Sequence, residues 1–215
     1  MSDLDISLYG ILDPNRSRGR PLPELAAAAA RGGVTLLQYR DKTADTRTMV
    51  ETAHDILEAL EEFDVPLLIN DRVDVALAVS ADGVHLGQSD MLPEDARDLL
   101  GDDAIIGLTI KNRRHASEAP VDLLDYVCIG GVFTTLSKDN PTAIGLDGWS
   151  SVAGHFRQTA HRLPVGAIAG IDETNCADVI SNGADGVAII SAIFMADDVE
   201  AATRDLAKIV QEARR

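Results

Sequence analysis

The chain has 215 residues, of which 46% are hydrophobic and 25% charged, and its 35 acidic and 19 basic side chains give a formal net charge of −16. This balance is typical of a globular protein with a substantial core, and the acidic excess argues against nucleic acids and anionic membranes as partners. The chain has no basic, apolar start typical of a signal peptide, no apolar run long enough to span a bilayer and no CxxC motif, so we expect a cytoplasmic protein without disulfides or structural zinc.

Apolar, β-branched runs alternate with helical patterns from one end of the chain to the other. The runs predict eight strands, at Ile6–Leu12, Thr35–Arg40, Pro66–Asn70, Gly83–Leu86, Ile105–Ile110, Tyr126–Phe133, Val165–Ile171 and Gly186–Ser191. Helical periodicity lies between most of them and is clearest at Glu24–Arg31, Thr46–Glu61, Pro93–Leu100, Cys176–Ser181 and Ala201–Val210. Strands separated by helices predict βαβ units and a parallel sheet.

Eight parallel strands are the number that closes an α/β barrel. The alternative is an open, doubly wound sheet, which usually has fewer strands and a glycine-rich dinucleotide turn after the first one. Here the first strand runs into Asp13-Pro14-Asn15-Arg16, without a GxGxxG motif. No linker or charge block divides the chain, so we predict an α/β fold, a (β/α)8 TIM barrel, as a single domain over residues 1–215.

Polar side chains gather where these strands end, which is where such barrels place their active sites. One such cluster is also common on an ordinary surface, but five or six at one end of a barrel indicate a functional site. Gln38, Arg40 and Lys42 alternate along the extended end of the second strand and therefore lie on one side of it. Asp71 and Asp90 follow the third and fourth strands, whose axes lie roughly 4.8 Å apart, so the two carboxylates can share one hard cation.

Six segments carry a resemblance to a known family, in order and in spacing. They are QYRDK at 38–42, INDRVDVA at 69–76, GVHLGQSD at 83–90, DYVCIGGVFTTLSKDN at 125–140, AIAGID at 167–172 and GADGVAIISAIF at 183–194. Together they resemble thiamine phosphate synthases over nearly the whole chain, from Leu8 to Phe194. The resemblance implies a transferase that joins a hydroxymethylpyrimidine pyrophosphate to a thiazole phosphate, either carboxythiazole or hydroxyethylthiazole phosphate. Thiamine phosphate forms and pyrophosphate leaves in a dissociative substitution.

The resemblance also implies a cofactor and a set of site residues. Mg2+ is assigned to Asp71 and Asp90. The pyrimidine pyrophosphate is assigned to Gln38, Arg40, Lys42, Asn70, Thr109 and Lys138, and the thiazole phosphate to Thr135, Ser137, Gly170, Ile190 and Ser191. Arg40, Thr109 and Lys138 are the expected catalytic residues. Lys138 would contact the leaving pyrophosphate from its loop, and Thr109, which replaces a usual serine, would donate a hydrogen bond there.

Several local interpretations stay open at this point. Asp71 could instead pair with Arg72 or cap the next helix, and Asp90 could cap the helix near Leu92. His85, flanked by apolar residues, is interpreted as a hydrogen-bonded wall residue rather than a general base. The segment 134–148 is rich in Ser, Thr, Asn and Gly and lacks two prolines that the family commonly has, at Gly131 and Thr134, so we interpret it as a mobile lid.

Three other functions compete with this one. A thiazole tautomerase with the same barrel would need neither Mg2+ nor the set of Gln38, Arg40 and Lys42. A non-catalytic regulator that binds a phosphate ligand would not need Asp71, Asp90 and Lys138. A lysine-dependent aldolase would need a desolvated lysine, whereas Lys138 is predicted on a loop. The sequence leaves the oligomeric state open, including a homo-oligomer.

Overall fold

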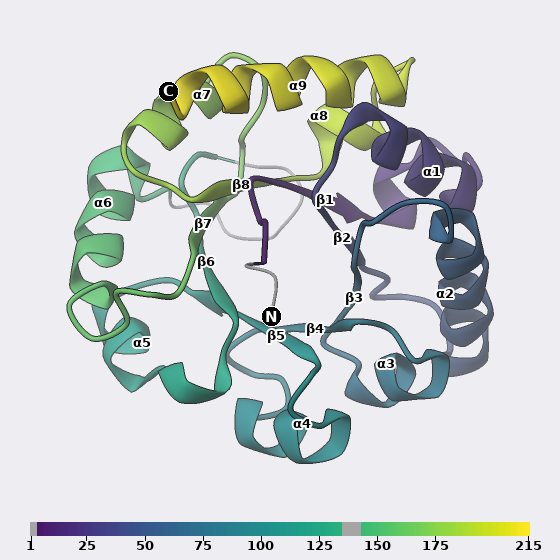
Figure 1. Ribbon diagram of the computed structural model, residues 1–215, viewed down its shortest axis with the longest axis horizontal. Helices are drawn as coiled ribbons and strands as arrows, with labels where there is room; N and C mark the ends of the chain where they lie inside the picture. The colour runs from purple at the N-terminus through teal and green to yellow at the C-terminus, as the bar shows by residue number, and fades with distance from the viewer. Residues whose placement is uncertain (1–3, 135–142) are drawn as a thin grey trace.

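The computed structural model describes residues 4–134 and 143–215, which form a ring of parallel strands surrounded by helices (Figure 1). Each strand pairs with the next in chain order, and the last pairs with the first, which closes the barrel. The strands are β1 (Leu8–Leu12), β2 (Leu36–Tyr39), β3 (Leu67–Asn70), β4 (Gly83–Leu86), β5 (Ile105–Ile110), β6 (Tyr126–Gly130), β7 (Val165–Ile168) and β8 (Gly186–Ile189). The predicted barrel is confirmed, and the open sheet is excluded.

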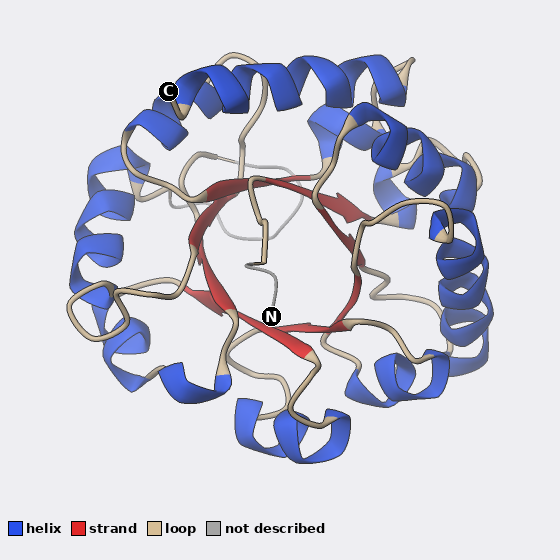
Figure 2. Ribbon diagram, viewed as in Figure 1, coloured by secondary structure: helices blue, strands red, loops and turns tan. Residues whose placement is uncertain are grey.

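Helices cover the outside of the ring (Figure 2). They are α1 (Leu22–Gly32), α2 (Thr46–Leu60), α3 (Val73–Val79), α4 (Pro93–Leu100), α5 (Arg113–Glu118), α6 (Gly145–Phe156), α7 (Cys176–Ser181), α8 (Ser191–Phe194) and α9 (Val199–Ala213), with 3-10 turns η1 (Pro14–Arg16) and η2 (Val121–Leu123). Aspartates begin the two longest helices: Asp45 accepts from the Thr48 N–H and Asp198 from the Ala201 N–H. These side chains satisfy backbone donors that a helix start leaves unpaired.

Several predicted strand ends are wrong in detail. β6 and β7 stop before their predicted ends because Gly131, Ala169 and Gly170 have positive φ angles, which an extended strand cannot continue. Ser191 is not a strand residue but the first residue of α8. In the segment 134–148, which was interpreted as a lid, residues 145–148 form the first turn of α6, and residues 135–142 lie outside the described residues.

The core has two layers, because side chains along each strand alternate between the barrel interior and the helices. The larger cluster lies between strands and helices, and a smaller cluster fills the barrel. The smaller cluster contains Ile6, Tyr9, Ile11, Leu36, Leu68, Tyr126, Cys128, Ile168 and Ala188. Gly107 of β5 makes room for one of these rings, since a Cβ there would overlap the Tyr126 side chain. The interior is therefore closed at mid-height and leaves its polar residues at the carboxyl ends of the strands.

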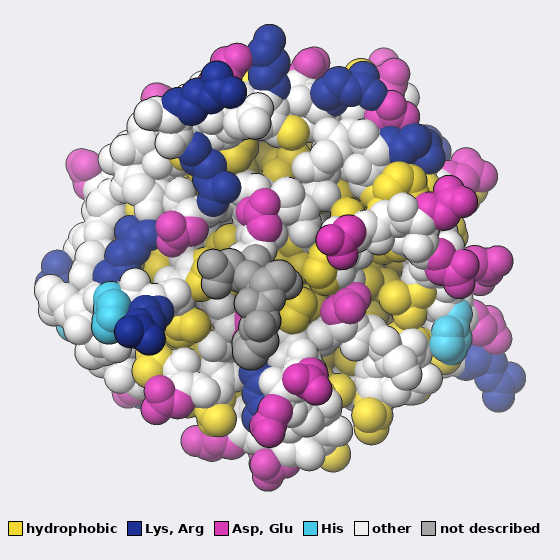
Figure 3. Space-filling view, in the orientation of Figure 1, with side chains coloured by type: hydrophobic (Ala, Val, Ile, Leu, Met, Phe, Trp, Pro, Cys, Tyr) yellow, Lys and Arg dark blue, Asp and Glu magenta, His cyan; other side chains and the backbone are white. Residues whose placement is uncertain are grey.

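The outer surface reflects the composition. Acidic side chains are spread over the face shown in Figure 3, with basic groups interspersed among them. Among residues 4–134 and 143–215, no helix has the length and apolar character needed to cross a bilayer.

Candidate functional site

Three of the predicted site residues point into the barrel from its strands. Gln38 ends the interior face of β2, Asn70 ends that of β3, and Thr109 lies near the end of β5; all three are buried. The Asn70 amide Nδ2 is buried and has no hydrogen-bond partner among the described residues. A buried amide donor without a partner costs free energy, and a ligand that accepts its hydrogen bond removes that cost. Asn70 therefore marks the inner wall of a binding site.

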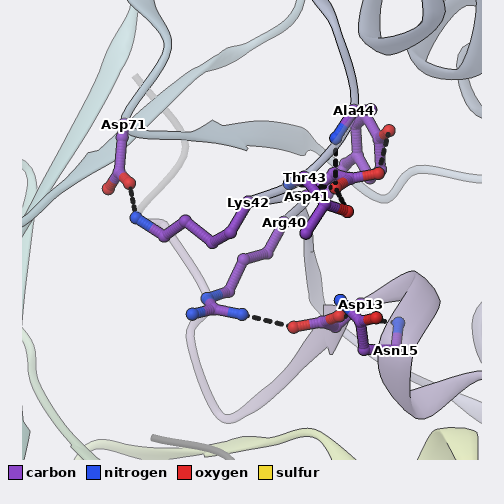
Figure 4. Close-up of polar contacts among 9 residues, drawn as sticks. Asp13, Asn15, Arg40, Asp41, Lys42, Thr43, Ala44 and Asp71 are labelled. Carbon is purple, nitrogen blue, oxygen red and sulfur yellow. Dashed lines mark hydrogen bonds and ion pairs between the residues drawn. The ribbon is translucent and has the colours of Figure 1, made fainter. Parts of the chain in front are cut away.

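Arg40 extends from the end of β2 to a carboxylate that is not among the predicted site residues. Its guanidinium forms an ion pair with Asp13, directly after β1, and the Asp13 side chain is only 5% exposed (Figure 4). The other oxygen of Asp13 accepts a hydrogen bond from the Asn15 N–H at 2.9 Å, which starts η1. A buried carboxylate is stable in the fold only with such partners. Asp13 thus holds Arg40 over the barrel mouth, and its place at a strand end was the signal that could have identified it.

Lys42 reaches from the same segment to a different strand end, where its ammonium contacts Asp71 (Figure 4). The loop that carries Lys42 is organised by Asp41, whose Oδ1 accepts hydrogen bonds from the Thr43 N–H at 2.8 Å and the Ala44 N–H at 3.0 Å. Such local bonds are a turn motif typical of aspartate. Arg40 and Lys42 lie on one side as predicted, and each is paired with a carboxylate of a neighbouring strand.

Asp71 adopts a strained backbone conformation, with a φ of 61° that non-glycine residues rarely use. The Asp71 N–H donates to the His85 carbonyl at 3.0 Å, and the Arg72 N–H donates to the Asn70 carbonyl at 2.7 Å, which together hold this turn. Arg72 itself pairs with Asp74, and no side chain caps α3, so both alternatives for Asp71 are wrong. Strain of this kind is typical of functional sites, where it directs a side chain.

The two candidate metal ligands are close enough to influence each other. Burial raises the pKa of the Asp71 carboxyl, and the hydrogen bond and charge of Asp90 raise it further against the opposing effect of Lys42. Asp90 accepts a hydrogen bond from the Gly87 N–H at 2.7 Å instead of capping α4, which begins without a side-chain cap. Two neighbouring carboxylates, one of them already touched by an ammonium group, form a pair that favours an added cation.

The pair of Asp71 and Asp90 suits Mg2+ better than it suits a metal ion whose ligands all come from the protein. No group of three or more His, Cys, Asp or Glu side chains that could hold a metal occurs in the described part of the chain. Mg2+ usually takes one or two carboxylates and completes its octahedron with water and substrate phosphate oxygens. Asp71 and Asp90 are thus a ligand set suited to a metal that arrives with a phosphorylated substrate.

His85 lies below these groups, buried inside the barrel. Its Nδ1 is 2.7 Å from the Tyr126 hydroxyl, and its Nε2 is 2.7 Å from the Thr109 hydroxyl. The interpretation of His85 as a hydrogen-bonded wall residue is confirmed. No sequence pattern indicated that His85 joins these two hydroxyls, nor that Tyr126 contacts Tyr9 in turn.

The other side of the barrel mouth is built from backbone turns. Gly170 follows β7 with a φ of 67°, and a Cβ at this position would lie 2.5 Å from the Thr134 carbonyl oxygen. The Phe133 N–H donates to the Ala169 carbonyl at 3.0 Å, which ties the β6 loop to the β7 turn. Only glycine allows both the angle and this close approach. Ile190 and Ser191 lie at the start of α8, and the predicted residues Thr135, Ser137 and Lys138 lie outside the described residues.

Comparisons with known proteins place the chain in one family. The family model described as "Thiamine monophosphate synthase" matches residues 8–193. The chain is 50% identical to the thiamine-phosphate synthase of Agrobacterium fabrum over 214 residues, which is 99% of this chain and 97% of that protein. It is 44% identical to the enzyme of the same name from Chloroflexus aurantiacus, over 96% of this chain and 94% of that one.

A solved structure supports the same assignment. Thiamine phosphate pyrophosphorylase from Pyrococcus furiosus superimposes with a TM-score of 0.85 and 38% identity over 98% of each chain. The predicted resemblance is therefore confirmed: this chain belongs to the thiamine monophosphate synthase family.

Proposed function

We propose that the mouth of this barrel binds a hydroxymethylpyrimidine pyrophosphate together with Mg2+ and joins it to a thiazole phosphate. Family membership supplies the activity, that of a thiamine-phosphate synthase, which is a transferase. The structural observation that carries the assignment of substrates is the partly buried Asp71 carboxylate, which follows a strained backbone turn and lies near Asp90, beside an Asn70 amide that has no partner among the described residues. This arrangement offers a cation site and a hydrogen-bond donor to one ligand.

The reaction is a substitution at the methylene carbon of the pyrimidine. The carbon–oxygen bond breaks, and pyrophosphate leaves with the electron pair while the aminopyrimidine ring donates electrons to the methylene. The ring nitrogen of the thiazole then forms the new carbon–nitrogen bond with its own lone pair. No proton has to be removed to make that nitrogen reactive, so the site needs no nucleophile–base pair. The protein contributes by placing the two rings and by balancing the charge on the leaving group.

Charge balance comes from the half of the mouth formed by β2, β3 and β4. Mg2+ held by Asp71 and Asp90 would supply positive charge to the phosphate oxygens. Arg40 offers a planar pair of donors to the same oxygens, and Lys42 offers a point charge. Both side chains are already held over the mouth by carboxylates, Asp13 and Asp71. The pyrophosphate gives each of them a second anionic partner, within a protein whose net charge is −16.

The thiazole phosphate belongs on the opposite side, by the same proposal. The turn at Gly170 and the start of α8 at Ile190 and Ser191 present backbone N–H groups from the ends of the last two strands, where barrels of this type often bind phosphate. The roles of Thr135, Ser137 and Lys138 rest on the sequence resemblance alone. Lys138→Ala should slow the chemical step more than it weakens binding of the thiazole phosphate.

The decisive experiment mixes the purified protein with both substrates and Mg2+ and follows thiamine phosphate by mass spectrometry and pyrophosphate by a coupled assay. The two products should appear in equal amounts and only when all components are present. The protein should also be incubated with the thiazole phosphate alone, because a tautomerase would convert it without the second substrate. Absence of thiamine phosphate with both carboxythiazole and hydroxyethylthiazole phosphate would exclude the proposal.

A further inference from the structure

The loop between β1 and α1 contacts both sides of the barrel mouth, because β1 lies between β8 and β2 in the ring. At its start, Asp13 pairs with Arg40 on the proposed pyrophosphate side. At its end, the Nη2 of Arg20 donates a hydrogen bond to the Phe194 carbonyl at 2.6 Å. Phe194 ends α8 and is 174 residues away in the sequence, yet Figure 1 shows α8 beside α1. This loop therefore joins the carboxylate that holds Arg40 to the helix that follows β8.

Local hydrogen bonds hold the loop in one conformation. The Asp13 carboxylate accepts from the Asn15 N–H, and the buried Ser17 hydroxyl donates to the Pro14 carbonyl at 2.8 Å. The Ser17 carbonyl in turn accepts from the Nε of Arg20 at 3.1 Å. The Arg20 guanidinium thus uses one donor on its own loop and another on α8. A planar group with several fixed donors is suited to such a double contact.

α8 is too short to keep its place by its own hydrogen bonds, since it has only four residues, Ser191–Phe194. The Phe194 N–H donates to the Ile190 carbonyl at 2.9 Å, and the Met195 N–H donates to the Ser191 carbonyl at 3.0 Å. The carbonyls at the end of a helix have no partner within it, and an arginine side chain is one of the groups that can satisfy them. Arg20 does this for Phe194, whose own N–H holds Ile190.

The Phe194 side chain is fixed against β1 as well. It is fully buried, and its Cζ lies 3.2 Å from the place where a Cβ of Gly10 would be. Glycine at this position of β1 therefore lets the ring pack closely on the strand. The carbonyl and the ring of one residue both contact the region of β1, which restricts movement of α8 relative to that strand.

Arg18 makes a second contact with the same end of α8, but a more exposed one. Its Nη1 donates to the Met195 carbonyl at 3.1 Å and pairs with Asp197, and these two side chains are 49% and 93% exposed. Solvent weakens an ion pair at such a surface. Arg20 is partly buried, so it is the stronger of the two connections.

We propose that Arg20 is a positioning residue for the thiazole phosphate. By holding the Phe194 carbonyl, it fixes Ile190 and Ser191 at a set distance from Asp13, and so from Arg40. The substitution requires the thiazole nitrogen to lie close to the pyrimidine methylene, and a displacement of about 1 Å can slow such a step about a hundredfold. The inference rests on the proposed function, in which the thiazole phosphate binds at the start of α8. Arg20 acts through α8 and not by contact with a substrate.

The test uses Arg20→Met, which keeps an apolar stem and removes both hydrogen bonds. KM for the thiazole phosphate should rise about tenfold, as expected when a hydrogen bond from a charged donor is lost, and kcat should fall because the two rings are no longer aligned. KM for the pyrimidine pyrophosphate should not change. Arg20→Lys should recover only part of the loss, because one ammonium group does not reproduce the planar set of donors.

The unphosphorylated hydroxyethylthiazole serves as a second probe, because it lacks the group that the start of α8 is proposed to bind. Its inhibition constant should be the same in the wild type and in Arg20→Met. An equal loss of affinity for the phosphorylated and unphosphorylated compounds would overturn the proposal, since Arg20 would then not act on the phosphate seat.

Arg157→Met is the matched control, because Arg157 makes the same kind of contact at the opposite end of β8. Its Nη2 donates to the Gly183 carbonyl at 2.7 Å and pairs with Asp185 at 2.8 Å, just before the strand begins. Arg157→Met should lower thermal stability about as much as Arg20→Met and leave both KM values unchanged. A similar rise in KM for the thiazole phosphate in the two variants would mean that the effect is a general loss of stability, and would refute the proposal.

Hydrogen exchange of the protein without substrates supplies a readout that does not depend on turnover. The amides of Phe194 and Met195 should exchange faster in Arg20→Met and keep their wild-type protection in Arg157→Met. Wild-type protection of these amides in Arg20→Met would contradict the positioning role. If the wild type forms no thiamine phosphate, the proposed function fails instead, and the exchange rates still report whether Arg20 fixes α8.

Discussion

The two sides of the barrel mouth, which we propose to bind different ligands, are built in different ways. The side formed by β2, β3 and β4 consists of charged side chains that are already paired, Arg40 with Asp13 and Lys42 with Asp71. The side formed by β6, β7 and β8 shows, in its described part, backbone turns such as the one at Gly170. The first side can exchange partners when a charged ligand arrives, whereas the second depends on backbone geometry that is set before binding. Substitutions should therefore affect charge and metal dependence on one side, and shape on the other.

The largest effect should come from removing one metal carboxylate. Asp71→Asn and Asp90→Asn should each lower Mg2+-dependent synthesis roughly a thousandfold, which corresponds to about 4 kcal/mol of lost charge stabilisation. Asparagine tolerates the φ of 61° at position 71, so the fold should persist. Steady-state rates across a Mg2+ titration, with thermal unfolding as the check on folding, measure both effects.

The control for this prediction is Asp74→Asn, because Asp74 is a neighbouring aspartate that pairs with Arg72 instead of facing Asp90. Its activity should stay close to that of the wild type. Full turnover by the wild type in excess EDTA would contradict the assignment of Mg2+ to Asp71 and Asp90. It would also contradict the view that only one side of the mouth depends on a metal.

A smaller effect should follow a change of backbone shape on the thiazole side. Gly170→Ala combines a positive φ with a Cβ 2.5 Å from the Thr134 carbonyl oxygen. We expect the unfolding free energy to fall by about 2–3 kcal/mol and KM for the thiazole phosphate to rise on the order of tenfold. KM for the pyrimidine pyrophosphate should change little.

Gly101→Ala is the matched control, since Gly101 has a φ of 85° but no atom within 4 Å of the place where a Cβ would lie. It should lose only the conformational cost of about 1–3 kcal/mol that a side chain meets at this φ with a ψ of 177°, and no activity. Equal effects of the two substitutions on both KM values would mean that Gly170 serves the fold alone.

The ion pair at the pyrophosphate side should give a further, more selective effect. Asp13→Asn keeps an oxygen for the Asn15 N–H but removes the charge that holds Arg40. KM for the pyrimidine pyrophosphate should rise about tenfold, or about 1.4 kcal/mol, and KM for the thiazole phosphate should not. Arg40→Lys should show the same selectivity because it loses the planar donor pair. An equal rise in both KM values would contradict the division of the mouth into two sides.

The smallest effect concerns the loop that presents Lys42. Burial acts to raise the pKa of Asp41, but the N–H groups of Thr43 and Ala44 outweigh it and leave the pKa lowered from 3.8. A carboxyl with a lowered folded-state pKa stabilises the fold above its unfolded pKa, and that contribution is lost as the pH falls through the lowered value. Asp41→Asn should therefore lower the unfolding free energy by about 0.5–1 kcal/mol at pH 7 and by less below pH 3.8. Denaturation at both pH values measures the difference; a constant difference would contradict the assigned cause.

Much of the fold could be predicted because each strand is a short apolar run between helical patterns. The bounds of β4, β5, α4 and α7 agree with the prediction residue for residue. The helices α3 and α5 were not predicted, because VDVALAV is almost wholly apolar and RRHASE almost wholly polar, so neither shows a helical period. The strands predicted for β6 and β7 were too long. Apolar residues continue past the true strand ends, although the backbone already turns at Gly131 and Ala169.

The candidate site could be predicted where its residues follow strand ends in the sequence. Arg40, Lys42, Asn70 and Asp71 were predicted in this way, and they stay predictions. The partners of those residues were not, because they come from distant strands. Asp13 is 27 residues from Arg40, and Tyr126 is 117 residues from Tyr9. A spacing pattern cannot show contacts that arise only when the barrel closes.

The sequence by itself determined the architecture, the family and the chemical character of the barrel mouth. Alternation along a strand decides which side chains face inward, and strand order decides which carboxylates are neighbours. Only the tertiary structure decided how these groups are paired and oriented, including the strained turn at Asp71 and the contacts of His85 with the Tyr126 and Thr109 hydroxyls. The physical reason is that closing the barrel buries polar groups from separate strands together, and each must then find a partner that the local sequence does not specify.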